Sequence, residues 1–266
     1  MTDWTASLPP HFALYAMSGL GVGILVGMTG VGGGSLMTPL LILLFGIHPS
    51  TAVGTDLLYA AVTKTAGTAF HGFRRTVDWR ITRLLASGSI PATLLTIFMM
   101  HRAATQGVAY GQILAPVLAV SLVLTAICLV LRQRILDFAA RRVPEPRPAT
   151  VAGITVLSGV VLGVLVTLTS VGAGAVGMTA LVLLYPRHST VRLVGSDIAH
   201  AVPLTLLAGI GHWYLGAINL PLLGALLIGS LPGILLGSYA ATRVPGVVLR
   251  SLLAVTLLLV ARQLVV

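Results

Sequence analysis

The glycine-rich stretch GMTGVGGGSLMTP spans residues 27–39 and interrupts a run of apolar residues. It holds Gly30, Gly32, Gly33 and Gly34 within five positions. Glycine in a helix interior is about 1 kcal/mol less favourable than alanine, so we expect a helix to break here. The composition of the residues on both sides indicates whether this helix belongs to a soluble or a membrane protein.

The flanking residues are typical of a membrane protein. The chain has 266 residues, of which 56% are hydrophobic and only 8% are charged, whereas about a quarter of the residues are charged in a soluble domain. About 20 apolar residues form a helix long enough to cross a bilayer. Runs with few or no ionisable groups cover 11–28, 52–63, 84–100, 112–131, 151–169, 193–211, 220–241 and 247–261. The sequence therefore predicts an all-α polytopic protein whose partner is the lipid bilayer.

Basic residues gather between the apolar runs. The net charge is +10, but most of the arginines lie in two loops, 71–83 and 132–150, without the interleaved aromatic residues of a nucleic-acid-binding module. Arginine-rich loops of membrane proteins stay in the cytoplasm. We therefore expect no nucleic-acid partner and place both loops on the cytoplasmic side.

The glycine-rich stretch occurs twice. LVGMTGVGGGS at 25–35 aligns with LVTLTSVGAGA at 165–175, and VGTD at 53–56 aligns with VGSD at 194–197. We therefore predict two transmembrane repeats, 1–131 and 151–266, joined by the Arg- and Pro-rich linker 132–150. The apolar segments are 11–29, 35–46, 52–70, 81–100 and 111–131 in the first repeat, and 151–169, 175–185, 191–211, 219–241 and 247–265 in the second.

Matched loops of the two repeats differ in charge. Loop 71–83 carries four arginines, whereas its partner 212–221 carries none. Because arginine-rich loops stay inside, equivalent loops should face opposite sides of the membrane. We therefore predict inverted repeats, with a cytoplasmic linker and both termini external.

The second segment of each repeat is too short to cross a bilayer at 1.5 Å per residue. We expect segments 35–46 and 175–185 to return from glycine turns as bent hairpins, with tips at 30–34 and 170–174 that meet near the midplane. Inverted repeats with broken helices are common in secondary transporters, whose site lies at the midplane. Free amides and helix N-termini at such tips favour anions. The alternative is that the glycines serve only tight helix crossing.

Apart from arginines within four residues of a segment end, three charged residues lie inside the predicted spans: Asp56, Lys64 and Asp197. Each costs roughly 2.5–3.5 kcal/mol at a helix centre, so a charge there indicates function. Lys64, the single lysine, suits an anionic substrate, and a structural pair with an aspartate is the alternative. Asp56 and Asp197 are repeat partners that either couple protons or lie near the starts of their own helices, where the dipole stabilises an acid. His200, three residues after Asp197, is the third proton-coupling candidate or a hydrogen-bonded packing residue.

The chain shows no catalytic or metal-binding motif. It has one cysteine, Cys128, and one glutamate, Glu145, and neither an HExxH nor a GxSxG pattern. We therefore predict no enzyme activity, no cofactor and no metal site.

Three stretches carry a family resemblance: TGVGGGSLMTP at 29–39, HPSTAVGTDLLYAAVTKTAGTAFHGFRRTVDWR at 48–80 and GSIPATLL at 88–95. With their degenerate second copies they resemble the TauE/SafE family of sulfite exporters over nearly the whole chain. The resemblance implies a multi-pass protein of the prokaryotic plasma membrane, with two inverted repeats, that moves small sulfur-containing anions. By position, the family's glycine turns correspond to Gly30–Gly34 and Ser170–Gly174, and its polar third helix to Thr55, Asp56 and Tyr59, with Ser196, Asp197 and His200 as the second copy.

The sequence thus favours a secondary transporter of sulfite, sulfoacetate or a related organosulfonate that works by alternating access, with proton coupling through Asp56, Asp197 or His200. The alternatives are a passive small-anion channel, a non-transporting membrane scaffold and a cation transporter that uses the two aspartates. The predicted substrate-binding residues are Thr29, Gly30, Gly32, Gly33, Gly34, Ser35, Thr55, Tyr59, Lys64, Thr169, Ser170, Gly172, Gly174 and Ser196.

Overall fold

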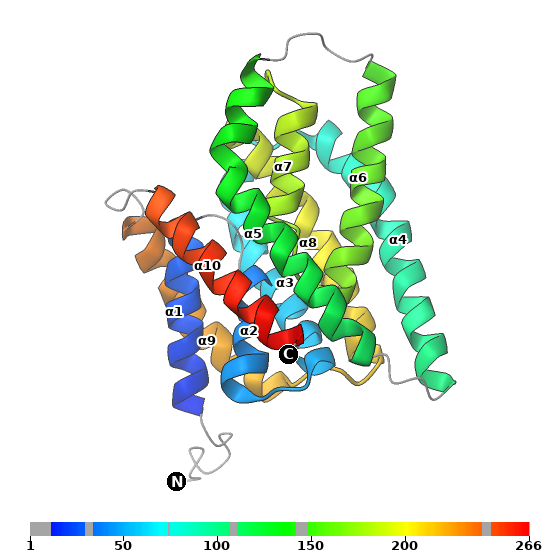
Figure 1. Cartoon of the computed structure of the whole chain (residues 1–266), viewed down its shortest axis with the longest axis vertical. Helices are drawn as coiled ribbons and strands as arrows, with labels where there is room; N and C mark the ends of the chain where they lie inside the picture. The colour runs from blue at the N-terminus through cyan, green and yellow to red at the C-terminus, as the bar shows by residue number, and fades with distance from the viewer. Residues whose placement is uncertain are drawn as a thin grey trace.

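The computed structural model describes residues 12–29, 34–73, 75–106, 111–141, 148–240 and 246–265. Within these ranges the chain forms ten helices and no strand (Figure 1). The first five are α1 (Phe12–Thr29), α2 (Gly34–Phe45), α3 (Pro49–Phe73), α4 (Trp79–Thr105) and α5 (Gly111–Arg141). The other five are α6 (Pro148–Thr169), α7 (Ala175–Leu184), α8 (Thr190–Tyr214), α9 (Leu220–Ala240) and α10 (Gly246–Val265).

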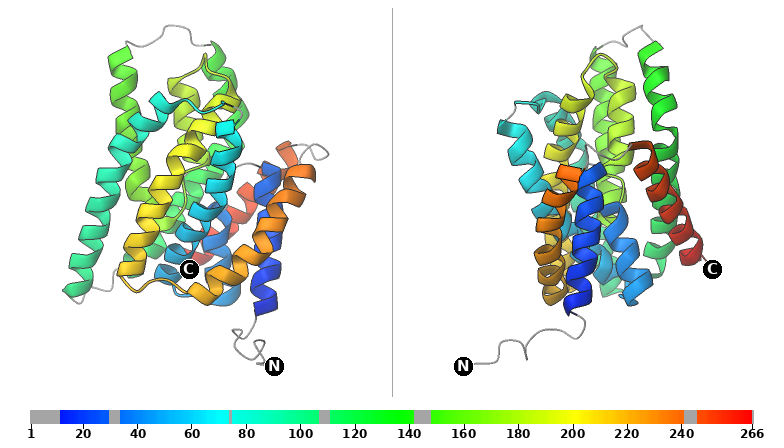
Figure 2. Two further views of the ribbon diagram at one scale, coloured as in Figure 1. Left: turned by 180° about the vertical axis from the view of Figure 1, so that it is seen from behind. Right: turned by 90° about the vertical axis from the view of Figure 1, so that its left-hand side faces the viewer.

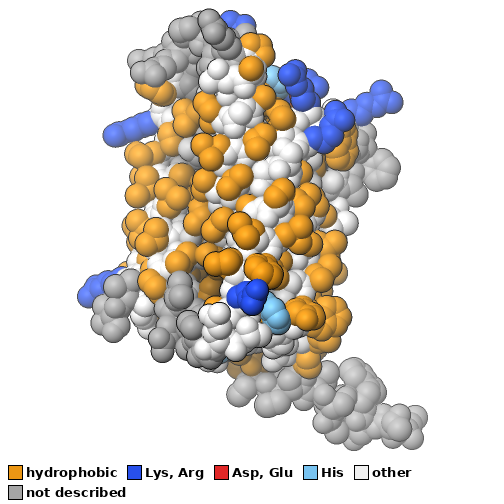
Figure 3. Space-filling view, turned by 90° about the vertical axis from the view of Figure 1, so that its right-hand side faces the viewer, with side chains coloured by type: hydrophobic (Ala, Val, Ile, Leu, Met, Phe, Trp, Pro, Cys, Tyr) orange, Lys and Arg blue, Asp and Glu red, His pale blue; other side chains and the backbone are white. Residues whose placement is uncertain are grey.

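The helices are those of a multi-pass membrane protein. In the described residues, five of them contain spans that are long and apolar enough to cross a bilayer, in α4, α5, α6, α8 and α9. On the face formed by α4 and α6, hydrophobic side chains cover most of the height of the molecule, and Lys and Arg side chains lie near its two ends (Figure 3). The exposed apolar side chains of these two helices include Leu95 and Phe98 of α4 and Leu157 of α6. The predicted all-α polytopic class is confirmed.

Two central helices carry the predicted site. Helices α3 and α8 lie side by side in the middle of the molecule, with α4 against α8 and α9 against α3 (Figure 2). Around them α1 packs on α9, α6 packs on α4, and α5 packs on α10. The same pairs of helices pack in both repeats. The α1–α9 contact corresponds to the α6–α4 contact, and the α3–α9 contact corresponds to the α8–α4 contact. The opposite membrane orientation of the two repeats, and the division at 132–150, stay predictions.

Matched glycines bring the outer helix pairs together. A Cβ atom at Gly23 of α1 would lie 2.5 Å from the carbonyl oxygen of Ser230 in α9. A Cβ atom at Gly163 of α6 would lie 2.6 Å from the carbonyl oxygen of Ser89 in α4. Gly23 and Gly163 are repeat partners, as are Ser230 and Ser89. Backbones approach this closely only where no side chain intervenes, which is the small-residue packing of membrane helices.

Both short helices return along the helix that precedes them. The hydroxyls of Thr155 in α6 and Tyr185 after α7 lie 2.9 Å apart. In the first repeat, the rings of Tyr15 in α1 and Phe45 in α2 lie edge to face with centroids 4.8 Å apart. Each end therefore comes back beside the start of the preceding helix, as the bent-hairpin prediction requires. The first hairpin turn, with Gly30, Gly32 and Gly33, lies outside the described residues.

The helices extend beyond the apolar segments that the sequence marks. Helix α3 continues to Phe73, and α4 begins at Trp79, because Asp78 caps α4 by accepting the amides of Arg80 and Ile81. Helix α5 likewise continues to Arg141, well into the predicted linker. Polar ends of a helix satisfy their hydrogen bonds outside the apolar layer as well as inside it, so hydropathy underestimates helix length.

Candidate functional site

The turn between α6 and α7 has an irregular backbone. Ser170 and Gly172 have positive φ angles of 59° and 115°. The Thr169 hydroxyl lies within the turn, where it donates to the Leu165 carbonyl at 2.6 Å and accepts the Val171 amide at 3.1 Å. A residue with a side chain rarely adopts the angle of Gly172. The predicted binding residues Thr169 and Gly172 therefore shape this turn.

The turn leaves a row of amides without acceptors. In the described part of the chain, the N–H groups of residues 172–176 donate in no hydrogen bond, and the Gly174 N-cap has no side chain to cap α7. The next amide, of Gly177, donates to the Gly172 carbonyl at 3.1 Å. Val171, Ala173 and Ala175 are buried. Buried amides without partners at a helix N-terminus are donors available to an anion.

Asp197 of α8 lies against this first turn of α7. A Cβ atom at Gly177 would lie 2.5 Å from Asp197 Oδ1, so only glycine leaves room for the carboxylate. The Asp197 side chain is 4% exposed, and Oδ1 has no hydrogen-bond partner among the described residues. The Asp197 carboxylate is therefore buried beside a helix N-terminus, and no described group donates a hydrogen bond to its Oδ1.

Asp56 of α3 occupies the equivalent place in the first repeat. Its Oδ2 accepts the Thr38 amide at 3.2 Å and the Thr38 hydroxyl at 2.6 Å. Thr38 is the fifth residue of α2, so Asp56 lies near the start of that short helix. Asp56 and Asp197 are each the eighth residue of their own helix. Because a helix dipole acts mainly within its first turn, the dipoles that these acids meet are those of α2 and α7 rather than their own.

Lys64 is the buried cation of the site. It lies on α3 about two turns after Asp56, is 9% exposed, and is close enough to both aspartates to interact with them electrostatically. The described residues show no ion pair between Lys64 and either aspartate. A structural Lys–Asp pair, the alternative from the sequence, is therefore not formed in this conformation.

His200 and Tyr59 are repeat partners with matched neighbours. His200 Nε2 lies 2.8 Å from the hydroxyl of Ser89 in α4, while its Nδ1 has no partner. The Tyr59 side chain lies beside Ser230 in α9, and Ser230 is the repeat partner of Ser89. The second repeat therefore places an imidazole one helical turn from its aspartate, where the first places a phenol.

Thr55 and Ser196 connect helices. The Asn219 amide donates to Thr55 Oγ1 at 3.1 Å, and the Asp78 amide donates to Ser196 Oγ at 2.8 Å. These bonds join the N-terminal ends of α9 and α4 to α3 and α8. Both hydroxyls are therefore already used by the fold.

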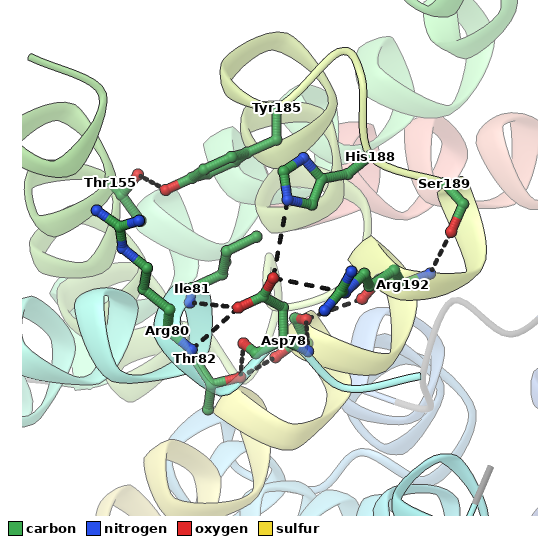
Figure 4. A network of polar contacts seen from close by, with 10 residues as sticks. Asp78, Arg80, Ile81, Thr82, Thr155, Tyr185, His188, Ser189 and Arg192 are labelled. Carbon is green, nitrogen blue, oxygen red and sulfur yellow. Dashed lines mark hydrogen bonds and ion pairs between the residues drawn. The ribbon is translucent and has the colours of Figure 1, made fainter. Parts of the chain in front are cut away.

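Sequence reasoning missed the polar cluster around Asp78. Asp78 Oδ2 lies 3.5 Å from Arg192 Nε and 3.7 Å from His188 Nε2, and all three side chains converge at the start of α8 (Figure 4). The repeat partner of Asp78 is the neutral Asn219. Comparing the two repeats position by position would have shown that this pair of caps differs in charge.

The structure thus gathers part of the predicted site. Ser170 lies beside Asp56, so the α6–α7 turn reaches the first repeat, and its buried hydroxyl is close enough to that carboxylate to interact with it. Gly34 begins α2. The side chains of Thr29 and Ser35 lie outside the described part of the chain. Among the described residues, no group of three or more His, Cys, Asp or Glu side chains is placed to hold a metal.

Comparison with known proteins places this architecture in a family. Residues 15–264 match the family model "Sulfite exporter TauE/SafE". The chain is 40% identical over 223 residues to "Probable membrane transporter protein YjnA" of Bacillus subtilis, covering 82% of this chain and 85% of that protein. It is 29% identical over 244 residues to "Probable membrane transporter protein YdhB" of the same organism, covering 88% and 92%. No solved structure matches significantly. The chain belongs to the TauE/SafE sulfite exporter family.

Proposed function

We propose that this protein is a secondary transporter of small sulfur-containing anions, such as sulfite, sulfoacetate or a related organosulfonate. Membership of the TauE/SafE family and the transporter names of its relatives support transport across a membrane. The observation that supports an anionic substrate is the row of amides at the start of α7, where the N–H groups of residues 172–176 lack acceptors. Ser170 adds a buried hydroxyl at the same turn, beside Asp56.

The chemistry of this turn suits an oxyanion. A sulfite or sulfonate group presents several oxygen acceptors within a small volume, and consecutive amides at a helix N-terminus present several donors. Lys64 contributes a positive charge that no ion pair occupies among the described residues. The two broken hairpins would form one site between the repeats, as in other transporters with repeated halves.

Alternating access would follow from the repeat-related packing. Helices α3 and α8 pack on each other, and each also packs on an outer helix, α3 on α9 and α8 on α4. Movement of one repeat against the other would then expose the site to each side of the membrane in turn. We assign the linker 132–150 to the cytoplasm and the termini to the outside from the distribution of arginine. We assign the protein to the prokaryotic plasma membrane from its family and its bacterial relatives.

A thermal-shift panel on the detergent-purified protein tests this function. A ligand that binds the folded state raises its melting temperature by mass action. We expect a saturable rise with at least one of sulfite, sulfate, thiosulfate, sulfoacetate and taurine, and none with acetate, phosphate or monovalent cations. Lys64→Ala should abolish the rise. Arg83→Ala removes an exposed cation near the start of α4. This matched control should keep the rise in melting temperature.

Transport itself separates the alternatives. In proteoliposomes, a transporter shows uptake that saturates with anion concentration, whereas a passive channel shows flux that does not saturate. A melting response to cations alone would favour cation transport through Asp56 and Asp197 and would refute the anion proposal. Folded protein that neither binds nor moves any solute of the panel would favour a scaffold.

A further inference from the structure

The buried charges of the site do not balance. Among the described residues, the formal charges in the core are the carboxylates of Asp56 and Asp197 and the ammonium of Lys64. With both acids ionised, the empty site carries a net charge of −1. An anion adds at least one more negative charge in a region of low dielectric, where like charges repel strongly. Anion binding is therefore favoured if the site gains a positive charge at the same time.

The two acids differ in how they are held. Asp56 Oδ2 accepts two hydrogen bonds, from the amide and the hydroxyl of Thr38. Asp197 accepts none in the described structure, and its Oδ1 faces the first turn of α7 at Gly177. Among the described residues Asp56 Oδ1 is also without a partner, but in Asp197 neither oxygen accepts a hydrogen bond, so a proton on Asp197 displaces none.

Asp197 also occupies the place that the anion requires. Its carboxylate lies beside the N-terminus of α7, and the unpaired amides of residues 172–176 belong to the same turn. A helix N-terminus stabilises one negative charge near it, and a second competes for the same partial positive charge. An ionised Asp197 and a bound anion therefore oppose each other, and protonation of Asp197 removes the conflict.

We propose that Asp197 takes up one proton when an anion binds at the first turn of α7 and releases it when the anion leaves. The anion and the proton then cross the membrane together. The proton comes from water and forms an O–H bond on the carboxylate, and release breaks that bond. His200 provides a neighbouring base with an unpartnered Nδ1, and Ser89 fixes the opposite side of its ring. This inference rests on the proposed function.

The groups that face Asp197 support its assignment. Helix α3 contributes Lys64, which interacts electrostatically with Asp197 and His200, and through Lys64 the site also includes Asp56. Helices α6 and α7 present Leu162 and Gly177. Helix α4 presents Ser89, while Asp78 at its start pairs with Arg192 and His188. Asp197 is therefore the unpaired acid of the second repeat.

The test measures anion affinity against pH. Sulfoacetate and thiosulfate keep their charge between about pH 6 and about pH 8, so a slope reports on the protein. If one proton is taken up per anion, the affinity of the wild-type protein rises as the pH is lowered, by up to about tenfold per pH unit where Asp197 is ionised in the empty site. Asp197→Asn should bind with an affinity that does not change with pH. Asp56→Asn, the repeat-matched variant, should keep the slope.

A direct count of protons supports the same test without a variant. Mixing wild-type protein with sulfoacetate in weakly buffered solution containing a pH dye should consume about one proton per anion bound. Anion binding with no pH slope and no proton uptake would overturn the inference and leave the proposed function standing. A slope that persists in Asp197→Asn and disappears in His200→Gln would also overturn it. Absence of anion binding at every pH would refute the proposed function itself.

Discussion

Asp78 and Ser196 lie 118 positions apart in the chain and are joined by a 2.8 Å hydrogen bond from the Asp78 amide to the Ser196 hydroxyl. The repeat partners of these residues, Asn219 and Thr55, form the same bond at 3.1 Å. Each bond connects the N-cap end of an outer helix to the residue before an intramembrane aspartate. A movement of α4 would therefore displace the residue next to Asp197, and a movement of α9 would displace the residue next to Asp56.

Asp78 serves two roles that substitutions separate. Asp78→Asn keeps the capping oxygen but removes the ion pairs with Arg192 and His188, so we expect less than about 1 kcal/mol of lost stability, since a partly exposed ion pair contributes little. Asp78→Ala also removes the cap of α4 and should cost about 1 kcal/mol more. Thermal unfolding in detergent measures both. Equal losses for the two variants would contradict the capping role.

The close helix contacts should not tolerate a methyl group. Gly23→Ala and Gly163→Ala would place a Cβ atom against a backbone carbonyl of the neighbouring helix, and we expect each to cost about 1–3 kcal/mol from overpacking. Gly21→Ala and Gly153→Ala are matched controls, because a Cβ atom there meets nothing within 4 Å. The controls should be neutral or slightly stabilising in the same unfolding assay.

The turn before α7 depends on a glycine. Gly172 has a φ angle of 115°, and we expect Gly172→Ala to lose about 1–3 kcal/mol of stability through backbone strain, together with anion binding. Gly216 has a φ angle of 71°, which asparagine adopts readily. Gly216→Asn should therefore unfold at nearly the wild-type temperature. Normal unfolding and normal anion binding in Gly172→Ala would show that the turn accommodates a side chain.

Two repeat-related serines offer a paired comparison. Ser89→Ala removes the hydrogen-bond partner of the buried His200 Nε2, and an unsatisfied buried group costs about 1–3 kcal/mol. The Ser230 hydroxyl has no hydrogen-bond partner among the described residues, so Ser230→Ala should cost much less. Unfolding temperatures of the two variants, measured side by side, should differ in this order.

Most of the helical framework can be predicted from the sequence, because hydropathy and glycine spacing are local properties. The break before α7 follows from the glycine turn, and the short lengths of α2 and α7 follow from their apolar segments. The partners of polar side chains could not be predicted in this way. The bond between Asp56 and Thr38 depends on how a hairpin folds against a third helix, and helical periodicity carries no information about that packing.

The roles of individual hydroxyl groups could not be predicted from the sequence either. Thr55 and Ser196 stand next to the intramembrane aspartates, so adjacency in sequence favours a role in binding. In the structure they accept amides from the start of helices that lie far along the chain. The sequence does contain a signal for these bonds, since donors and acceptors are both repeat partners, but only the folded chain shows that they meet.

The glycine-lined contacts also constrain how the chain is made. Helix α1 packs on α9, so α1 stays in the bilayer without this partner until α9 has been synthesised. During that interval Gly19 and Gly23 face lipid or an insertion chaperone rather than a protein backbone. A fragment that ends before Leu220 would lack the helix against which Gly19 and Gly23 pack, and we expect membrane quality-control proteases to degrade it.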